Sequence, residues 1–181
     1  MKVIFLDHDG VICLSNNWGG RTKKWAKYRS ENPDSSKEKK DAPVFVRFDD
    51  FDKKAIKVLN EIIEETGCEI VVSSDWKNWG DLEQMQKMYI TRGIKPPIDL
   101  TPNMKDFDED GFGFFKWKNL YEAIRVNEIL EWLKNHPEVT HWVAVDDLDL
   151  SKLGNFVMTT RPYNEGIKQC GIKDKILNFL K

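Results

Sequence analysis

Three short apolar runs in this chain each end directly in reactive polar side chains. They are KVIFL, which runs into Asp7, EIVV, which runs into Ser73, and HWVAV, which runs into Asp146. Runs of this kind are typical of parallel strands that are buried on both faces. Because the carboxyl ends of such strands meet at one edge of a doubly wound sheet, we expect the three polar ends to converge on one crevice. This pattern predicts an α/β fold whose reactive groups share one sheet edge.

Stretches with helical periodicity separate the apolar runs. Apolar residues recur at helical spacing in 52–65, 81–92, 120–135 and 173–180. A further strand is expected at 155–158, and the proline-rich segment 95–113 is expected to be a loop. The alternation of strands and helices predicts one domain over residues 1–181, with a parallel sheet between two helical layers.

Residues 15–50 interrupt this pattern between the first strand and the first helix. Their stretch NNWGGRTKKWAKYRS interleaves Lys and Arg with Trp and Tyr, a composition suited to phosphate contacts and base stacking. The alternative is an amphipathic helix whose aromatic side chains close over the site. Both interpretations predict a small basic cap insertion, because a cap that closes a site also selects its substrate.

Composition excludes several classes of protein. With 181 residues, 40% of them hydrophobic and 32% charged, and a net charge of -2, the chain suits a single folded domain and not an extended disordered one. No run approaches the roughly 18 apolar residues of a membrane-spanning helix, and the first residues do not resemble a secretory signal. We therefore expect a cytoplasmic protein without a membrane partner. The widely spaced Cys13, Cys68 and Cys170 are expected to be small buried hydrophobic residues, not a disulfide framework or a zinc site.

Acidic residues dominate the predicted sheet edge and imply a bound cation. The carboxylates concerned are those of Asp7, Asp9, Asp146 and Asp147. Carboxylates that converge repel one another unless a cation neutralises them, and all-oxygen ligation suits Mg²⁺. Mg²⁺ is therefore the expected cofactor. The acidic run 106–110 lacks the spacing of a calcium loop and is expected to be a solvated turn.

The motifs LDHDGV, VVSS and VAVDD, with a basic residue ahead of a helix before the last of them, resemble the four-motif signature of haloacid dehalogenase (HAD) superfamily phosphatases. The resemblance spans most of the chain and implies a HAD-like Rossmannoid α/β/α core with a small cap insertion after the first strand. It implies that Asp7 is the nucleophile that forms an aspartyl phosphate. Asp9 would act as general acid toward the leaving group and then as general base for water. An acid at this position favours phosphate ester hydrolysis.

The same resemblance implies roles for the other motif residues. The metal ligands would be Asp7, the carbonyl of Asp9, Asp146 and Asp147, with a lesser contribution from Asp149. Ser73 would hydrogen-bond the transferring phosphoryl oxygens, assisted by the backbone amide of Ser74. Gly10 would permit the tight turn that follows the nucleophile.

The third motif requires a cation that balances the charge of the phosphorane. Arg125 stands at the head of VNEILEWL, close to the setting of the family's basic residue. Lys118, further upstream, is the alternative and a candidate substrate-binding residue.

Other polar and aromatic residues near the motifs are expected to pack. His8 is expected to point away from the metal. Trp76 and Trp79 follow the second motif closely, and we expect them to pack or to line the mouth of the site. His136 and His141 have no partners at metal-ligand spacing and are expected to be structural.

A narrower resemblance relates RVNEILEWL, WVAVDDLDL and FVMTTRPYNEGI to the HAD domains of RNA repair proteins, although Val126 stands where a glycine is expected. Together with the basic insertion, it implies a Mg²⁺-dependent phosphohydrolase that removes phosphate from a nucleic-acid end, RNA or DNA, or from a nucleotide. The alternatives are a phosphomonoesterase of small metabolites and a nucleic-acid-binding module with vestigial catalysis. The intact Asp7, Asp9 and Asp146 count against the binding module. The sequence carries no P-loop, so kinase activity is not expected, and it predicts no particular protein partner.

Overall fold

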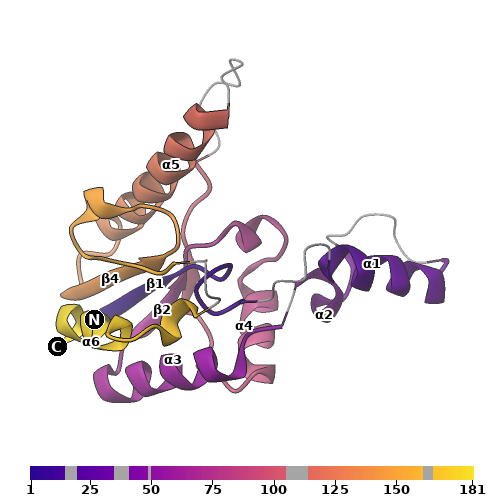
Figure 1. The fold of residues 1–181 in the computed structure, drawn as a ribbon, viewed down its shortest axis with the longest axis horizontal. Helices are drawn as coiled ribbons and strands as arrows, with labels where there is room; N and C mark the ends of the chain where they lie inside the picture. Colours follow the sequence, from indigo (N-terminus) through magenta and orange to yellow (C-terminus); the bar gives the residue numbers. More distant parts are fainter. Residues whose placement is uncertain (15–19, 35–40, 49, 105–113, 161–164) are drawn as a thin grey trace.

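The computed structural model describes residues 1–14, 20–34, 41–48, 50–104, 114–160 and 165–181, with the backbone alone for 20–23, 45 and 114–119. Five strands in these parts of the chain form one parallel sheet in the order β3-β2-β1-β4-β5 (Figure 1). They are β1 (Lys2–Leu6), β2 (Glu69–Val72), β3 (Asp99–Leu100), β4 (His141–Asp146) and β5 (Phe156–Met158). The predicted parallel α/β fold is confirmed, and β1 lies at the centre of the sheet.

The register of the sheet places the polar ends of its central strands side by side. Leu6 is aligned with Val72 on one neighbouring strand and with Val145 on the other. The next residue, Asp7, donates its backbone N–H to the Val145 carbonyl at 3.0 Å, and Ser73 donates to the Leu6 carbonyl at 3.0 Å. The side chains that follow β1, β2 and β4 therefore emerge at one edge, as expected for parallel strands.

Alternate residues of the strands enter two hydrophobic clusters, one on each face of the sheet. Ile4 and Leu6 of β1 belong to the larger cluster, which includes buried residues of α3, α4 and α6, whereas Val3 and Phe5 belong to the other, which includes buried residues of α5. Figure 1 shows α3 and α6 on the side of the sheet opposite α5. The bounds are α3 (Lys53–Thr66), α4 (Leu82–Thr91), α5 (Phe114–Lys134) and α6 (Ile172–Leu180). The domain thus has the three layers that the sequence predicts.

The helix ends explain why the predicted helices form where they do. Asp52 caps α3 by accepting hydrogen bonds from two backbone N–H groups of the first turn, and Gly67 ends the helix in the left-handed conformation at φ 67°. Asp81 and Gln84 form a reciprocal capping box at the start of α4. Helices α3 and α4 therefore begin and end within a residue of the bounds that periodicity alone predicts.

Two helices lie in the segment between β1 and α3. They are α1 (Gly20–Glu31) and α2 (Val44–Arg47), and Figure 1 shows them to one side of the core, beyond α4. Arg47 joins α2 to the core by donating from Nη1 to the Trp79 carbonyl at 2.7 Å and to Gln84 Oε1 at 2.9 Å. On α1, the rings of Trp25 and Tyr28 are stacked, with centroids 6.0 Å apart.

The structure differs from the sequence-based expectation at three points. The segment 95–113 contains β3, which pairs with β2 at the edge of the sheet and is too short to show a periodic pattern. Helix α5 begins at Phe114, earlier than the expected residue 120. Cys170 is exposed, which contradicts the expectation that it is buried, whereas Cys13 and Cys68 are buried as expected. The acidic run 106–110 lies outside the described residues.

Within the described ranges, no helix is both long enough and apolar enough to cross a membrane.

Candidate active site

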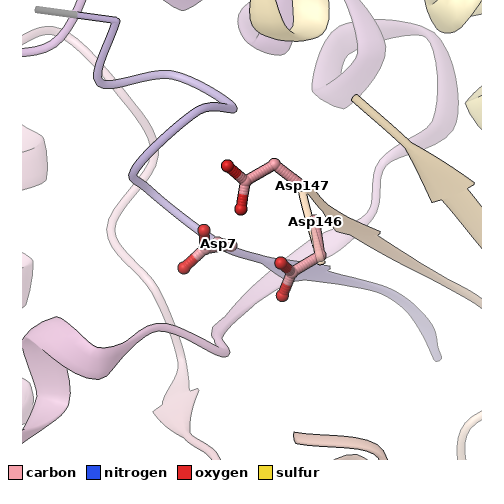
Figure 2. A group of neighbouring side chains, drawn as sticks. All are labelled: Asp7, Asp146 and Asp147. Atoms are coloured by element: carbon pink, nitrogen blue, oxygen red, sulfur yellow. The ribbon is translucent and has the colours of Figure 1, made fainter. Parts of the chain in front are cut away.

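The ends of β1 and β4 bring three carboxylates together. One oxygen each from Asp7, Asp146 and Asp147 lies within 4.8 Å of the others. Figure 2 shows the three side chains gathered around a common point beyond the strand ends. Asp7 and Asp146 are buried, at 5% and 1% exposure, and Asp147 is half-buried. The structure therefore brings together three of the residues that the resemblance implies as metal ligands.

Burial makes this cluster electrostatically costly when it holds no cation. Burial raises the pKa of the Asp7 carboxyl well above its usual value, and the neighbouring charge of Asp146 raises it further against the opposing effect of Arg125. Burial likewise raises the pKa of Asp146 to about 6, although Arg125 acts in the other direction. The cluster therefore favours a bound cation, or a proton in its place.

Arg125 supplies one positive charge to the cluster from α5. Its Nη1 donates to Asp7 Oδ1 at 3.2 Å, to Asp146 Oδ2 at 2.9 Å and to the backbone carbonyl of Ser73. Its Nη2 donates to Asp75 Oδ1 at 3.0 Å. Burial acts to lower the pKa of this guanidinium, but the surrounding carboxylates outweigh that effect and raise it, so the side chain is charged. Arg125 thus contacts the residues at the ends of three strands, Asp7, Ser73 and Asp146.

A second buried ion pair lies beside Arg125 and was not anticipated from the sequence. Glu128, one turn further along α5, accepts a hydrogen bond from Lys77 Nζ, and its Oε2 lies 4.0 Å from Arg125 Nε. Lys77 also donates to Thr101 Oγ1 at 2.9 Å and to the Pro102 carbonyl at 3.0 Å. Burial lowers the pKa of Lys77 against the opposing effect of Glu128. Nothing in the local sequence distinguishes this lysine from a surface one, because its burial depends on how α5 packs on the sheet.

Ser73 and Ser74 directly follow β2 at the same edge of the sheet. The Ser73 hydroxyl is buried and has no hydrogen-bond partner among the described residues. Ser74 Oγ accepts a hydrogen bond from the backbone N–H of Trp76 at 3.5 Å. The Ser74 hydroxyl also acts to lower the pKa of Asp7. A buried hydroxyl without a protein partner is costly, so the Ser73 Oγ is suited to an acceptor on a bound ligand.

The turn after β1 holds Gly10 against the carboxylate cluster. Gly10 adopts φ 80°, a conformation that favours glycine, and a Cβ there would lie 2.7 Å from Asp147 Cγ. The carbonyl of His8 accepts three successive backbone N–H groups in this turn, and Thr159 Oγ1 donates to the Gly10 carbonyl at 3.0 Å. A side chain at position 10 would therefore displace one of the three clustered carboxylates.

Asp9 lies outside the carboxylate cluster and is partly exposed. Its Oδ2 accepts a 2.8 Å hydrogen bond from Nε1 of Trp76. Trp76 is buried, whereas Trp79 is exposed, so the two tryptophans after the second motif have different roles. The packing expected for Trp76 is observed, but its hydrogen bond to Asp9 was not foreseen, because a 67-residue separation leaves no local signal.

The remaining candidate residues are placed as follows. Lys118 lies in α5, but its side chain is outside the described part of the structure. Asp149 accepts at Oδ1 from the Ser151 N–H at 3.0 Å. His8 is fully buried and forms a 2.6 Å hydrogen bond between Nε2 and the Tyr89 hydroxyl. Its ring thus packs beneath the site, as expected.

The donor chemistry of the cluster fits a hard divalent cation. Its three carboxylates offer oxygen donors only, and these are the ligands that Mg²⁺ prefers. Burial, together with repulsion between the carboxylates, raises the pKa of Asp7 and Asp146 despite the nearby charge of Arg125, and a further cation would oppose this effect. The residues present are therefore suited to hold Mg²⁺.

Comparison with known proteins identifies the family. The model of the HAD domain in Swiss Army Knife RNA repair proteins matches residues 3–166, which is most of the chain. Neither the curated proteins nor the solved structures contain a significant match. The matched range includes Asp7, Ser73, Arg125 and Asp146, and the chain therefore belongs to the family of HAD domains found in Swiss Army Knife RNA repair proteins.

Proposed function

We propose that this protein is a Mg²⁺-dependent phosphohydrolase that works through an aspartyl phosphate on Asp7. The observation that carries the proposal is the convergence of Asp7, Asp146 and Asp147 within 4.8 Å of one another, with Arg125 donating to the first two. Hydrolase chemistry is general in HAD domains, which supports the same assignment.

The metal would be held by the same edge of the sheet. Its ligands would be the carboxylates of Asp7, Asp146 and Asp147 with the carbonyl of Asp9. When bound, Mg²⁺ supplies positive charge that stabilises the transferring phosphoryl group. The residues of the chain perform the bond-making and proton-transfer steps.

In the first step, a carboxylate oxygen of Asp7 attacks phosphorus in line with the leaving oxygen. The new O–P bond forms as the P–O bond to the leaving group breaks, and Asp9 transfers a proton to the leaving oxygen. Arg125 orients the attacking carboxylate through its 3.2 Å contact with Asp7 Oδ1 and balances the developing charge. The buried hydroxyl of Ser73, assisted by the Ser74 amide, binds a phosphoryl oxygen.

In the second step, water hydrolyses the aspartyl phosphate. Asp9, now ionised, accepts a proton from the water as its oxygen attacks phosphorus. The bond between phosphorus and the Asp7 carboxylate breaks, which releases inorganic phosphate and regenerates both carboxyl groups in their starting states.

The proposed substrate is a phosphorylated nucleic-acid end or a nucleotide. The description of the family as a domain of RNA repair proteins supports this class. So does α1, where Trp25 and Tyr28 are stacked and the Arg29 guanidinium lies 5.8 Å from the centre of the Trp25 ring, since bases stack on such surfaces. Residues 15–50 would then act as a small cap, and Lys118 on α5 would add a substrate contact.

Phosphate release with Mg²⁺ tests this function directly. The panel pairs 3′- and 5′-phosphorylated RNA and DNA oligonucleotides with nucleotides and sugar phosphates, and the Asp7→Asn variant serves as the control. We expect turnover of oligonucleotides or nucleotides that the control lacks. Preference for a sugar phosphate would instead identify a small-metabolite phosphomonoesterase. Oligonucleotide binding without any phosphate release would identify a binding module and overturn the proposal.

A further inference from the structure

Trp76 is buried to 1% exposure, yet its indole N–H reaches the partly exposed rim of the site. There Nε1 donates to Asp9 Oδ2 at 2.8 Å. Asp9 is the residue to which the proposed function assigns both proton transfers, and proton transfer requires close and directed contact with the reacting oxygen. We propose that Trp76 is a positioning residue that holds the Asp9 carboxylate in the orientation needed for proton transfer. This inference rests on the proposed function.

The indole ring is held rigidly, so the direction of its N–H is well defined. It is stacked on Phe48, with centroids 4.7 Å apart and an interplanar angle of 19°, and on Phe51 at 5.6 Å and 20°. The ring of His8 contacts it at 4.6 Å with an angle of 60°. A side chain packed in this way loses little further freedom when it forms a hydrogen bond, which favours its use as a fixed donor.

Trp76 also connects Asp9 to the base of the proposed cap. Phe48 directly follows α2, and Arg47 within α2 donates to the carbonyl of Trp79, three residues after Trp76. Phe48 and Phe51, which lie between α2 and α3, therefore pack on the ring that contacts the proposed acid. A displacement of α2 would therefore shift Phe48 against the Trp76 ring and alter the hydrogen bond to Asp9.

The chain contains a matched control for the loss of this hydrogen bond. Trp132, on α5, is also buried at 3% exposure, and its Nε1 donates to Asp99 Oδ2 at 2.7 Å. Asp99 begins β3 at the edge of the sheet and has no role in the proposed chemistry. Trp132→Phe therefore removes the same ring volume and the same kind of hydrogen bond as Trp76→Phe, but at a place where no proton transfer occurs.

The test measures kcat/KM for two esters that differ in their need for an acid. A nucleoside phosphate has a poor alkoxide leaving group, whereas p-nitrophenyl phosphate has a good one that needs little protonation. General acid catalysis contributes about 10²- to 10⁴-fold, so a misplaced acid should cost about tenfold or more with the nucleoside phosphate. For Trp76→Phe we expect that loss, with less than about twofold change for the aryl ester. Trp132→Phe should change both esters equally, if at all.

A double-mutant cycle separates positioning from a structural role. If Trp76 acts through Asp9, Trp76→Phe should have no further effect on the nucleoside phosphate in an Asp9→Asn background. Equal losses with both esters, or the same loss in the Asp9→Asn background, would overturn the inference and leave the proposed function intact. If wild-type protein turns over only the phosphorylated oligonucleotides of the panel, these replace the nucleoside phosphate, because their leaving group is also an alkoxide. A wild-type protein that releases phosphate from neither ester and from no oligonucleotide would overturn the proposed function and the inference together.

A second variant covers the case in which Trp76→Phe does not fold. Replacement of Trp76 by 3-benzothienylalanine keeps the bicyclic ring and its stacking but exchanges the N–H for sulfur. The same selective loss with the nucleoside phosphate is expected. Unchanged kcat/KM for both esters would show that the N–H is not used.

Discussion

Nη1 of Arg125 donates a 2.9 Å hydrogen bond to Oδ2 of Asp146, and both side chains are almost completely buried. The first residue lies on the helix that covers one face of the sheet, and the second ends a strand next to the central one. This ion pair therefore joins a helical layer to the carboxylate cluster. Removing Arg125 would leave the buried carboxylate of Asp146 without its cation, which couples the stability of the domain to its proposed chemistry.

Replacement of Arg125 should affect activity and stability together. Arg125→Ala is expected to lower kcat by about 10²- to 10³-fold, the usual cost of removing an electrostatic stabiliser of the transition state. It should also lower the free energy of unfolding by about 3–5 kcal/mol because Asp7 and Asp146 lose their cation. Phosphate release and thermal unfolding measure the two effects, with the exposed Lys134→Ala on the same helix as control. Activity within twofold of wild type would identify another residue, such as Lys118, as the third-motif cation.

The buried pair of Lys77 and Glu128 should contribute far more to stability than a surface pair. Lys77→Met leaves the buried Glu128 with the longer 4.0 Å contact to Arg125 as its remaining ion pair among the described residues, and we expect a loss of about 3 kcal/mol in the free energy of unfolding. The double variant Lys77→Met/Glu128→Leu should recover most of it, because the unpaired charge is gone. The exposed pair Lys87 and Glu83 provides the control, and Lys87→Met should cost under about 1 kcal/mol. Equal losses for the two lysines in urea unfolding would contradict this prediction.

Gly10→Ala should damage metal binding beyond the cost of its backbone conformation. The added Cβ would lie 2.7 Å from Asp147 Cγ at φ 80°. Gly67, at φ 67° with nothing within 4 Å of its would-be Cβ, isolates the conformational cost, which should be about 1–2 kcal/mol. Both variants should lose that much stability, but only Gly10→Ala should weaken Mg²⁺ binding in a calorimetric titration. Unchanged Mg²⁺ affinity in Gly10→Ala would show that Asp147 is not needed at the metal.

The stability of the metal-free protein should depend on pH through the titration of the carboxylate cluster. The folded-state pKa of Asp146 is raised to about 6, so the metal-free folded protein binds more protons than the unfolded chain between the ordinary carboxyl pKa and that value. Stability from this group is therefore present at low pH and is lost as the pH rises through about 6. Asp146→Asn removes this titrating group. The increase in Tm that it causes should therefore be larger at pH 7.5, above the pKa of about 6, than at pH 5, below it.

Added Mg²⁺ provides the complementary measurement. Protons and the metal compete for the same carboxylates, so Mg²⁺ should raise the Tm of the wild-type protein more at pH 7.5 than at pH 5, by a few degrees at saturation. The Asp146→Asn variant should show a smaller Mg²⁺ effect at both values. An equal Mg²⁺ effect in wild type and variant would mean that the ion binds elsewhere.

The sequence by itself determined the α/β class, the positions of the main helices and the shared edge at which Asp7, Ser73 and Asp146 emerge. It could do so because these features depend on local patterns: apolar runs, helical periodicity, caps such as Asp52, and the rule that parallel strands end on the same side. The two residues of β3 escaped prediction because they are too few to form a pattern. The exposure of Cys170 was not predicted, because a cysteine in a sequence does not indicate whether its side chain is buried or exposed to solvent.

Only the tertiary structure decided which distant side chains meet. The hydrogen bond from Trp76 to Asp9 joins residues 67 positions apart, and the contact from Lys77 to Glu128 joins residues 51 positions apart. Each depends on how α5 or the segment after β2 packs against the sheet, and a buried lysine or tryptophan has the same local sequence signature as an ordinary one. Local patterns therefore place the reactive groups at the edge, whereas packing selects the partners that orient them and set their charge.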